Sequence, residues 1–459
     1  MDPSDVSQSS RRAIDVNGAA AIWAIQPYCV LHLRRTFASI GSTLETAMNL
    51  SRPAKSKLVF AAIVVVIAIV APNARADAAT EWNIRAGEFV TAAGMATPPA
   101  CRAMAISHTA AFEAANAITK RYRSAAGAQA EAPSGASVDA AIAAAHRATW
   151  TRLLPSQQGA IDAAYRAALS TIADGAARDA GIVVGERAAA QTLALRADDG
   201  AMGPEAYRPL SIAGRYVPTV LPAVPQWPQR KPWLMSGPAQ FRPGPPPALD
   251  SDRWARDFNE IKAIGGRRSV LRSAEQSDIA RFWETTLPPV YHGVVRSVAG
   301  MPGRDLMRNA RLLAAVTQAV DDALIAVFDA KYHHAFWRPI TAIRNGDTDG
   351  NEATERDASW TPFIDTPMHP EYPCAHCIQA GVVGAILQAE IGSGAQPVLS
   401  TSSATANGAL RRWSSVEAFV QEVADARVYD GVHFRFSTEV GTEMGRRIGA
   451  LAIQRFLAE

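Results

Sequence analysis

Three short segments in the last third of the chain combine the residue types that bind and transform small oxyanions. The segments read KYHHAFWRP, HPEYPCAHC and ARVYDGVHF, and their candidate side chains are Lys331, Arg338, His376, Arg427 and His433. Together they supply three permanent cations, two imidazoles and one predicted helix N-terminus. That set suits the binding of a tetrahedral anion such as phosphate or vanadate, and chemistry on that anion.

The first segment places two cations seven residues apart, at Lys331 and Arg338. Seven residues are almost two turns of an α-helix, so the spacing predicts that both side chains project from nearly the same face. Like charges stacked in this way indicate a shared anion, and the alternative is a solvated basic edge. Pro339 is predicted to end the regular hydrogen bonding just after Arg338, which would put this cation at a helix end.

The second segment predicts a helix N-terminus, because Pro373 precedes an apolar stretch that begins near Cys374. Proline is tolerated at a helix start, where its missing N–H is not needed. The free N–H groups of the first turn, at Cys374, Ala375 and His376, would attract an anion that lies just beyond the helix end. His376 is then well placed for proton transfer, and the alternative is a surface histidine on a capped helix.

The third segment holds Arg427 and His433, six residues apart. That spacing puts them on different faces of one straight helix. Gly431 between them indicates a break, so that the two side chains can converge from different elements. The alternative is an arginine that ends a helix and a histidine in the core. His108, His146, His292 and His369 have no motif around them and are assigned no role.

Taken together, the three segments resemble the superfamily of type-2 phosphatidic acid phosphatases and vanadium-dependent haloperoxidases. The family pattern is Lys, six residues, Arg-Pro; then Pro-Ser-Gly-His; then Arg, five residues, His. The matching residues span 331–433: Lys331…Arg338-Pro339, Pro373-Cys374-Ala375-His376 and Arg427…His433. The helical texture from residue 77 onward is similar to the soluble haloperoxidase branch. The resemblance implies an all-α fold, with helical bundles around the anion site.

The resemblance also implies a role for each matching residue. Three cations would hold the equatorial oxygens of the anion: Lys331, Arg338 and Arg427. The backbone N–H of Ala375 would add a donor. His433 would be the apical ligand of vanadate, or the nucleophile that becomes phosphohistidine. His376 would be the acid–base residue.

Three functions are compatible with such a site. A haloperoxidase-like enzyme would use bound vanadate and hydrogen peroxide to oxidise a halide. A phosphate monoester hydrolase would work through a phosphohistidine at His433 and would need no cofactor. A protein that binds phosphate or vanadate without turnover is the third. In each case the partner is a small molecule, and phosphate would compete with vanadate.

Two residues depart from the family pattern. Ala375 replaces glycine and keeps the N–H, while Cys374 replaces serine and is a weaker hydrogen-bond donor. A thiolate at a helix N-terminus would repel an oxyanion, and peroxide would oxidise it. A disulfide between Cys374 and Cys377 would remove both objections, and we predict it for the exported protein. The alternative is a redox-active CxxC pair, which is typical of a βαβ texture that this sequence lacks.

The elements that must position these segments are predicted to be helices. Of the 459 residues 48% are apolar, alanine is abundant, and the apolar spacing is three and four throughout. In the first half we predict helices over 98–118, 137–154 and 156–172, and another that ends near 196. In the second half we predict helices over 252–264, 274–286, 304–330, 374–391, 414–426 and 437–457.

Between these helical regions lies a stretch, residues 218–247, with ten prolines. It cannot be helical, and we expect an extended connection that packs over the surface with Trp227, Trp233 and Phe241 as anchors. A docking site for an aromatic-grooved partner is the alternative. We therefore divide the chain into four parts: an N-terminal extension with signal peptide (1–76), an N-terminal helical region (77–217), a proline-rich connection (218–250) and a catalytic helical domain (251–459).

The N-terminal part indicates export. Three basic residues, Arg52, Lys55 and Lys57, precede an apolar run over 58–71, and Ala74-Arg75-Ala76 is a small-x-small cleavage site. Fourteen apolar residues are fewer than the roughly 20 of a membrane span, although an uncleaved anchor is the alternative. We expect a periplasmic or secreted protein, cleaved after Ala76, without a span in its mature form.

Charge and cysteine content exclude two further classes. Residues 1–76 hold eight Lys/Arg and four Asp/Glu, which leaves 38 basic and 39 acidic residues, a net charge of −1, in the rest of the chain. Nucleic-acid binding therefore has no compositional support. Three cysteines would remain after cleavage, which is too few for a disulfide scaffold.

Overall fold

The computed structural model describes residues 76–124 and 132–457 of the chain. Residues from Ala76 onward form one compact unit. The predicted signal peptide within 1–75 lies outside the described residues. Within them, no helix is long and apolar enough to cross a membrane.

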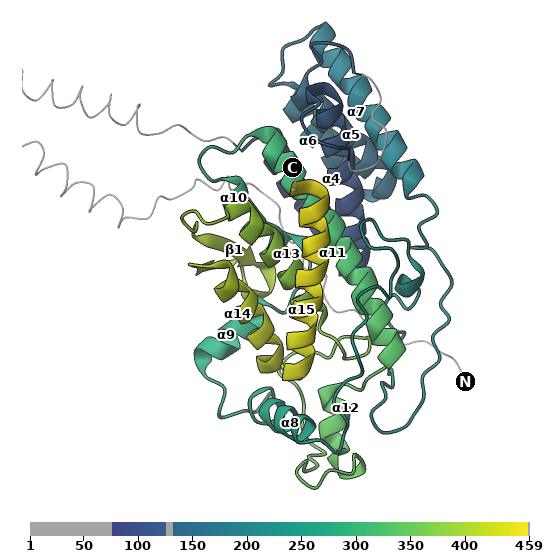
Figure 1. The fold of residues 1–459 in the computed structure, drawn as a ribbon, viewed down its shortest axis with the longest axis vertical. Coiled ribbons are helices and arrows are strands. Elements are labelled where there is room, and N and C mark those ends of the chain that lie inside the picture. Colours follow the sequence, from purple (N-terminus) through teal and green to yellow (C-terminus); the bar gives the residue numbers. More distant parts are fainter. Residues whose placement is uncertain (1–75, 125–131, 458–459) are drawn as a thin grey trace, which may run out of the picture. The chain divides into compact units, whose positions relative to one another are not determined.

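The described chain is built almost entirely of α-helices, as predicted (Figure 1). Before the proline-rich stretch lie α3 (Ala78–Ala92), α4 (Thr97–Thr119), α5 (Val138–Leu153), α6 (Gln158–Leu169) and α7 (Ala176–Leu195). After it come α8 (Asp252–Ile264), α9 (Ala274–Phe282), α10 (Pro288–Ala299), α11 (Leu306–His334), α12 (Pro339–Arg344), α13 (Ala375–Ile391), α14 (Val416–Tyr429) and α15 (Arg435–Ala452), which ends in a π-helical turn (Ile453–Leu457).

Several predicted helices match these bounds closely, including 252–264 for α8 and 374–391 for α13. Helices α10 and α12 were not among the predicted ones. Neither was an antiparallel hairpin of β1 (Leu399–Ser403) and β2 (Ala409–Trp413), which is the only sheet in the described chain. Both missed helices begin with proline at their first position. One of these prolines, Pro339, was predicted to end a helix and in fact starts one.

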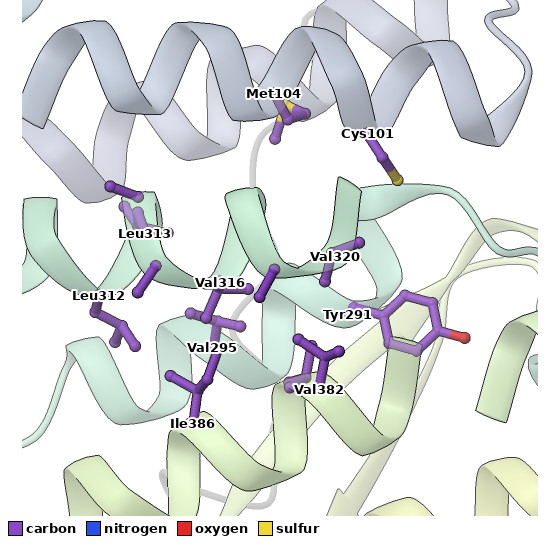
Figure 2. Close-up of a cluster of buried hydrophobic side chains, with 14 of the residues drawn as sticks. Cys101, Met104, Tyr291, Val295, Leu312, Leu313, Val316, Val320, Val382 and Ile386 are labelled. Atoms are coloured by element: carbon purple, nitrogen blue, oxygen red, sulfur yellow. The ribbon is translucent and has the colours of Figure 1, made fainter. Parts of the chain in front are cut away.

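Helix α11 is the central element of the core. Its residues from Met307 to Lys331 are almost all buried, which is typical of a helix covered on every side. Figure 1 shows α4 and α7 on one side of it and α13 and α15 on the other. Figure 2 shows how side chains from four helices interleave here: Cys101 and Met104 of α4, Val295 of α10, Leu313 and Val316 of α11, and Val382 and Ile386 of α13. One continuous core therefore holds the end of α11 and the start of α13 in fixed positions.

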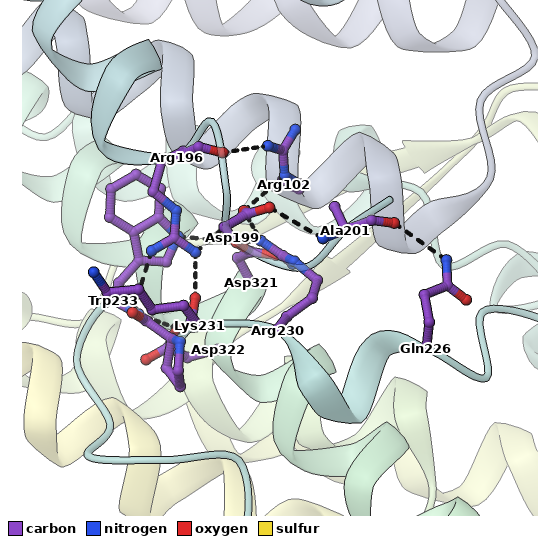
Figure 3. Close-up of polar contacts among 11 residues, drawn as sticks. Arg102, Arg196, Asp199, Ala201, Gln226, Arg230, Lys231, Trp233, Asp321 and Asp322 are labelled. Atoms are coloured by element: carbon purple, nitrogen blue, oxygen red, sulfur yellow. Dashed lines mark hydrogen bonds and ion pairs between the residues drawn. The ribbon is translucent and has the colours of Figure 1, made fainter. Parts of the chain in front are cut away.

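The proline-rich stretch is an irregular connection of turns and bends, and it is tied to α11 by carboxylates (Figure 3). It contains one short 3-10 helix (Trp227–Gln229), which the prediction had excluded. Asp321 accepts hydrogen bonds from Arg230 (2.6 Å) and from the indole of Trp233 (2.9 Å). Asp322 accepts the backbone N–H groups of Trp233, Leu234 and Met235 at 2.7–3.0 Å. Apart from that short helix, the proline-rich stretch has no regular backbone hydrogen bonding of its own, so the carboxylates of Asp321 and Asp322 accept hydrogen bonds from its N–H groups. Trp227 and Phe241 are buried, as expected of anchors.

Candidate active site

Lys331 lies in the last turn of α11 and is completely buried. Its Nζ donates to the backbone carbonyls of Pro370 (2.9 Å) and Glu371 (2.7 Å), in the loop before α13. Burial, and secondly the charge of Arg338, lowers its pKa well below the usual range. Lys331 therefore joins two of the three segments.

Arg338 reaches the site in a different way from the one predicted. Helix α11 ends at His334, and Ala335 turns the chain with a left-handed backbone (φ 48°). Arg338 is then the extended N-cap residue of α12, which Pro339 begins rather than ends. The prediction that Lys331 and Arg338 share one helical face is therefore wrong, because helix α11 ends between them.

The guanidinium of Arg338 is buried among groups from the other two segments. It donates to the carbonyls of His369 (2.8 Å) and Val432 (2.9 Å). The same group lies 2.9 Å from Nδ1 of His369 and 3.3 Å from Nε2 of His433. Burial lowers the pKa of Arg338 to about 10, so the side chain is still a cation at neutral pH.

The second segment forms the predicted helix N-terminus. Cys374 is the N-cap of α13, and its Sγ accepts the backbone N–H of Cys377 at 3.3 Å. The N–H groups of Ala375 and His376, in the first turn, have no acceptor within the helix. The N–H of Cys374 is not free, in contrast to our expectation, because it donates to the carbonyl of Ser437 (3.1 Å).

His376 is buried, and one of its ring nitrogens has no hydrogen-bond partner. Its Nε2 has no hydrogen-bond partner, while the carbonyls of Trp283 and Glu284 bond to the ring. Carbonyls accept, so the proton lies on Nδ1 and Nε2 carries the lone pair. Burial, and secondly the charge of Arg427, lowers the pKa of His376 well below its usual range. The neutral ring can therefore accept a proton through Nε2.

The third segment turns as predicted between its two candidate residues. Arg427 lies in the last turn of α14, and Gly431 follows with a positive φ of 78°. A Cβ at Gly431 would lie 2.2 Å from the carbonyl oxygen of Gly265, so only glycine fits there. Arg427 is fully buried, donates to the carbonyl of Trp283 (2.7 Å) and pairs with Asp430. Its Nε has no partner.

His433 lies in the loop before α15 and is held by a carboxyl group. Its Nδ1 is 2.9 Å from Oε1 of Glu371, which also accepts the backbone N–H of Phe434 (3.0 Å). Because Oε1 accepts, Nδ1 carries the proton and Nε2 keeps its lone pair towards Arg338. Burial, and secondly Arg338, lowers the pKa of His433 well below its usual range, so the ring is neutral.

Three residues of the site were missed by the sequence analysis: His369, Glu371 and Asp430. Burial raises the pKa of Glu371 to about 8 and that of Asp430 to about 7. His369 contacts Arg338 and packs edge-on against Phe328, with ring centroids 5.2 Å apart. A signal was present, because His369 and Glu371 stand inside the second segment, and Asp430 inside the third.

The disulfide between Cys374 and Cys377 is not formed in this structure, and its formation in the exported protein stays a prediction. Both cysteines are free and completely buried. Their Sγ atoms lie 2.7 Å apart and are joined by a hydrogen bond from the Cys377 thiol. A covalent bond would need a separation of about 2.05 Å. Cys374 therefore enters the site as a hydrogen-bond acceptor.

The structure thus brings the segments together around one buried, electropositive point. Arg338 contacts His433, and Lys331 binds the backbone of Glu371, which holds His433. Four buried polar atoms of these residues have no partner: Nε of Arg427, Nε2 of His376, Oε2 of Glu371 and Oδ1 of Asp430. Such groups are rare in folded proteins and indicate a missing partner. A donor set of this kind, with two carboxyl groups at its edge, fits a tetrahedral oxyanion.

Comparisons with known proteins show which family and which fold the chain is similar to. Residues 311–458, which contain all three segments, match the VCPO second helical-bundle domain. The structure is similar to that of a bacterial vanadium-dependent iodoperoxidase, with a TM-score of 0.70 and 24% identity over 82% of this chain and 95% of that chain. It is also similar to a bacterial vanadium-dependent chloroperoxidase in its holo and apo forms, with a TM-score of 0.63 and 18% identity. Those matches cover 79% of this chain and 93% or 94% of the other.

No curated protein matches the sequence. The described chain nevertheless has the fold of vanadium haloperoxidases, and the resemblance to that superfamily is confirmed.

Proposed function

We propose that this protein is a vanadium-dependent haloperoxidase, which uses bound vanadate and hydrogen peroxide to oxidise a halide. The observation that supports the proposal is the setting of His433, a neutral imidazole whose Nδ1 is held by a carboxyl group and whose Nε2 lies 3.3 Å from Arg338. The buried side chains of Lys331 and Arg427 also act on this ring electrostatically. The fold, shared with bacterial iodoperoxidase and chloroperoxidase structures, favours this function over the others.

In this proposal three side chains would hold the oxygens of vanadate: Lys331, Arg338 and Arg427. The N–H of Ala375 would add a donor at the positive end of α13. Nε2 of His433 would bind the vanadium, and Glu371 fixes the tautomer that leaves this nitrogen unprotonated. Cations in a dry site interact with an oxyanion far more strongly than they would in water.

When bound, vanadate supplies the Lewis acidity that activates hydrogen peroxide. The chain's own contribution to the chemistry is proton transfer. Nε2 of His376 is unprotonated, unpartnered and in the first turn of α13, so it accepts a proton from the incoming peroxide. Burial, and secondly the charge of Arg427, lowers the pKa of the ring and keeps it neutral before that step.

A second candidate is hydrolysis of phosphate monoesters, and one contact favours it. A carboxyl group on Nδ1 orients Nε2 of His433 as a nucleophile, as a phosphohistidine mechanism requires. The same cations would stabilise the transferred phosphoryl group. Binding without turnover is the third candidate, since Cys374 has replaced the serine of the family pattern.

One pair of assays on the full chain separates the three functions. Protein loaded with orthovanadate is given hydrogen peroxide with iodide, bromide or chloride, and the oxidised halogen is followed by absorbance. Vanadate-free protein is given p-nitrophenyl phosphate. We expect halide oxidation that requires vanadate and is inhibited by phosphate. Phosphatase activity without halide oxidation would overturn the proposal in favour of the second candidate, and neither activity would favour the third.

Export is also a proposal, based on the apolar run over 58–71 and the small-x-small site that ends at Ala76. An N-terminal sequence that begins at Asp77 in protein isolated from the periplasm or culture medium would support it. Full-length protein found only inside the cell would contradict it.

A further inference from the structure

Cys377 stands beside the anion site without a part in the chemistry proposed above. It is the third residue of α13, and its thiol donates to Sγ of Cys374, the N-cap residue, at 2.7 Å. Both side chains are completely buried, and both are free. Packing alone does not require two free thiols to be in contact at the start of a helix.

The two sulfur atoms have unequal surroundings. Sγ of Cys374 accepts both the N–H and the thiol of Cys377. Burial opposes a charge there, but the hydrogen bond from Cys377 and the cation of Arg427 together lower the pKa of Cys374 to about 7. Burial, and secondly the bond to Cys374, raises the pKa of Cys377 well above its usual range. Cys374 is therefore the nucleophilic sulfur, and Cys377 is a thiol ready to react with it.

Close packing keeps the pair together. A Cβ at Gly441 of α15 would lie 3.2 Å from Cβ of Cys377 and 3.3 Å from Cβ of Cys374. Ala424 of α14 belongs to the same small cluster. Cys101, the other free cysteine of the described chain, has no sulfur neighbour, and its thiol faces only the amide of Gln379 (3.8 Å). Among the described cysteines, then, only this pair is poised to form a bond.

We propose that Cys374 and Cys377 are a dithiol that hydrogen peroxide converts into a disulfide, and that the disulfide form binds the oxyanion more tightly. The inference rests on the proposed function for its oxidant, because peroxide is the co-substrate of that reaction. It concerns how tightly the site binds its anion before the reaction, which is separate from the catalytic steps.

The oxidation consumes one peroxide and both thiols. The Cys374 thiolate attacks one peroxide oxygen, the O–O bond breaks, and the leaving hydroxide takes up a proton to become water, which leaves Cys374 as a sulfenic acid. The Cys377 sulfur then attacks the Cys374 sulfur, the S–O bond breaks and a second water leaves. In sum, two thiols are oxidised to one disulfide, and one hydrogen peroxide is reduced to two waters.

The consequence for the site is electrostatic. A thiolate at Cys374 opposes the charges of Arg427 and Lys331, both of which act on it. The disulfide is neutral, so it no longer offsets the positive charges that attract the bound anion. The closed ring would also include Ala375 and His376, whose N–H groups and imidazole face the anion in the proposed function. Removing one like charge from a partly screened site strengthens binding by about tenfold.

The covalent step is tested on the reduced, vanadate-free full chain by mass spectrometry. After equimolar peroxide and alkylation under denaturing conditions, we expect the peptide that carries both cysteines to have lost two hydrogens and to resist alkylation. Cys377→Ser should stop at a Cys374 sulfenic acid that dimedone traps. Cys101→Ser, the matched control, should behave like the parent. Free thiols after peroxide, or direct oxidation of Cys374 to sulfinic acid in the parent, would overturn the inference.

The effect on the site is tested by calorimetric titration with inorganic phosphate, because vanadate itself oxidises thiols. We expect about tenfold tighter binding by the oxidised parent than by the reduced parent. Cys377→Ser should show no such gain after the same treatment. Equal affinities of the two parent forms would overturn the second half of the proposal. Neither readout uses halide oxidation, so a failure here and a failure of the proposed function are told apart.

Discussion

Two groups of buried histidines in this molecule differ in what surrounds them. One group lies at the anion site: His376 and His433, with the half-buried His369 beside them. The other lies where α3, α4, α5 and α10 meet: His108, His146 and His292. Burial lowers the pKa of all six, so a buried neutral imidazole by itself does not distinguish a reactive site from a packed core.

The second group bonds to neutral side chains, although Nε2 of His146 has no partner. The amide nitrogen of Asn83 donates to Nε2 of His108 (3.1 Å) and to Nδ1 of His292 (2.8 Å), while its oxygen accepts from Arg296 (2.8 Å). His146 bonds to Ser107 (2.7 Å) and stacks on a tryptophan ring. Within the described residues no group of His, Cys, Asp or Glu is arranged to hold a metal ion. The anion site therefore differs from the packed core in having cationic side chains beside an imidazole that has a free lone pair.

The largest expected effect separates the two groups directly. His433→Ala removes the proposed apical ligand, so we expect halide oxidation to fall by more than about a thousandfold while the protein stays folded. His146→Ala should leave kcat of the folded enzyme within about twofold and lower the free energy of unfolding by about 1–3 kcal/mol, because it opens a cavity. Halide oxidation and urea unfolding measure both. Activity that survives in His433→Ala would remove the distinction.

A smaller effect tests how His433 is positioned. Glu371→Gln keeps the volume but loses the carboxylate that holds Nδ1. We expect vanadate affinity to fall by about 10–100-fold, and the pH profile of activity to change as well, which a purely structural residue would not cause. Glu390→Gln is the matched control, since Glu390 is also a buried carboxylate on α13 but pairs with Arg304. An identical loss in both variants would assign Glu371 a structural role.

The smallest expected effect concerns the core histidines, and it is a change in the free energy of unfolding at acidic pH. Burial lowers the pKa of His108 to about 3, so the unfolded chain, with a pKa near 6.5, binds this proton first. The stabilisation by the neutral ring is fully present above about pH 6.5 and is lost as the pH falls from there towards the folded value. Its slope is at most about 1.4 kcal/mol per pH unit.

His108→Gln keeps an acceptor for Asn83 and removes the titration. Urea unfolding between neutral and mildly acidic pH should therefore show a shallower loss of stability than in the parent. The raised pKa values of Asp322 and Asp430 act in the opposite direction, so the difference between variant and parent isolates His108. Added phosphate, which occupies only the anion site, should leave that difference unchanged. An unchanged slope in the variant would contradict the assignment.

Much of the fold and of the site was predictable from local patterns. Alanine-rich windows with spacings of three and four predicted the helices, since helix formation depends mainly on nearby residues. The cap of α13 at Cys374 and the break at Gly431 are likewise set by neighbouring residues. The spacing of the three segments was sufficient to select the candidate cations and imidazoles and the family that they resemble.

Other features depend on residues far apart in the chain, and only the tertiary structure decided them. The turn at Ala335 places Arg338 beside His433, although helical spacing predicted a shared face with Lys331. Glu371 became a partner of His433, whereas His146 did not join any cation. The sequence determines the type of each side chain, but the packing of the helices determines which groups surround it. Those surrounding groups set the pKa of the side chain and therefore the reactions in which it can take part.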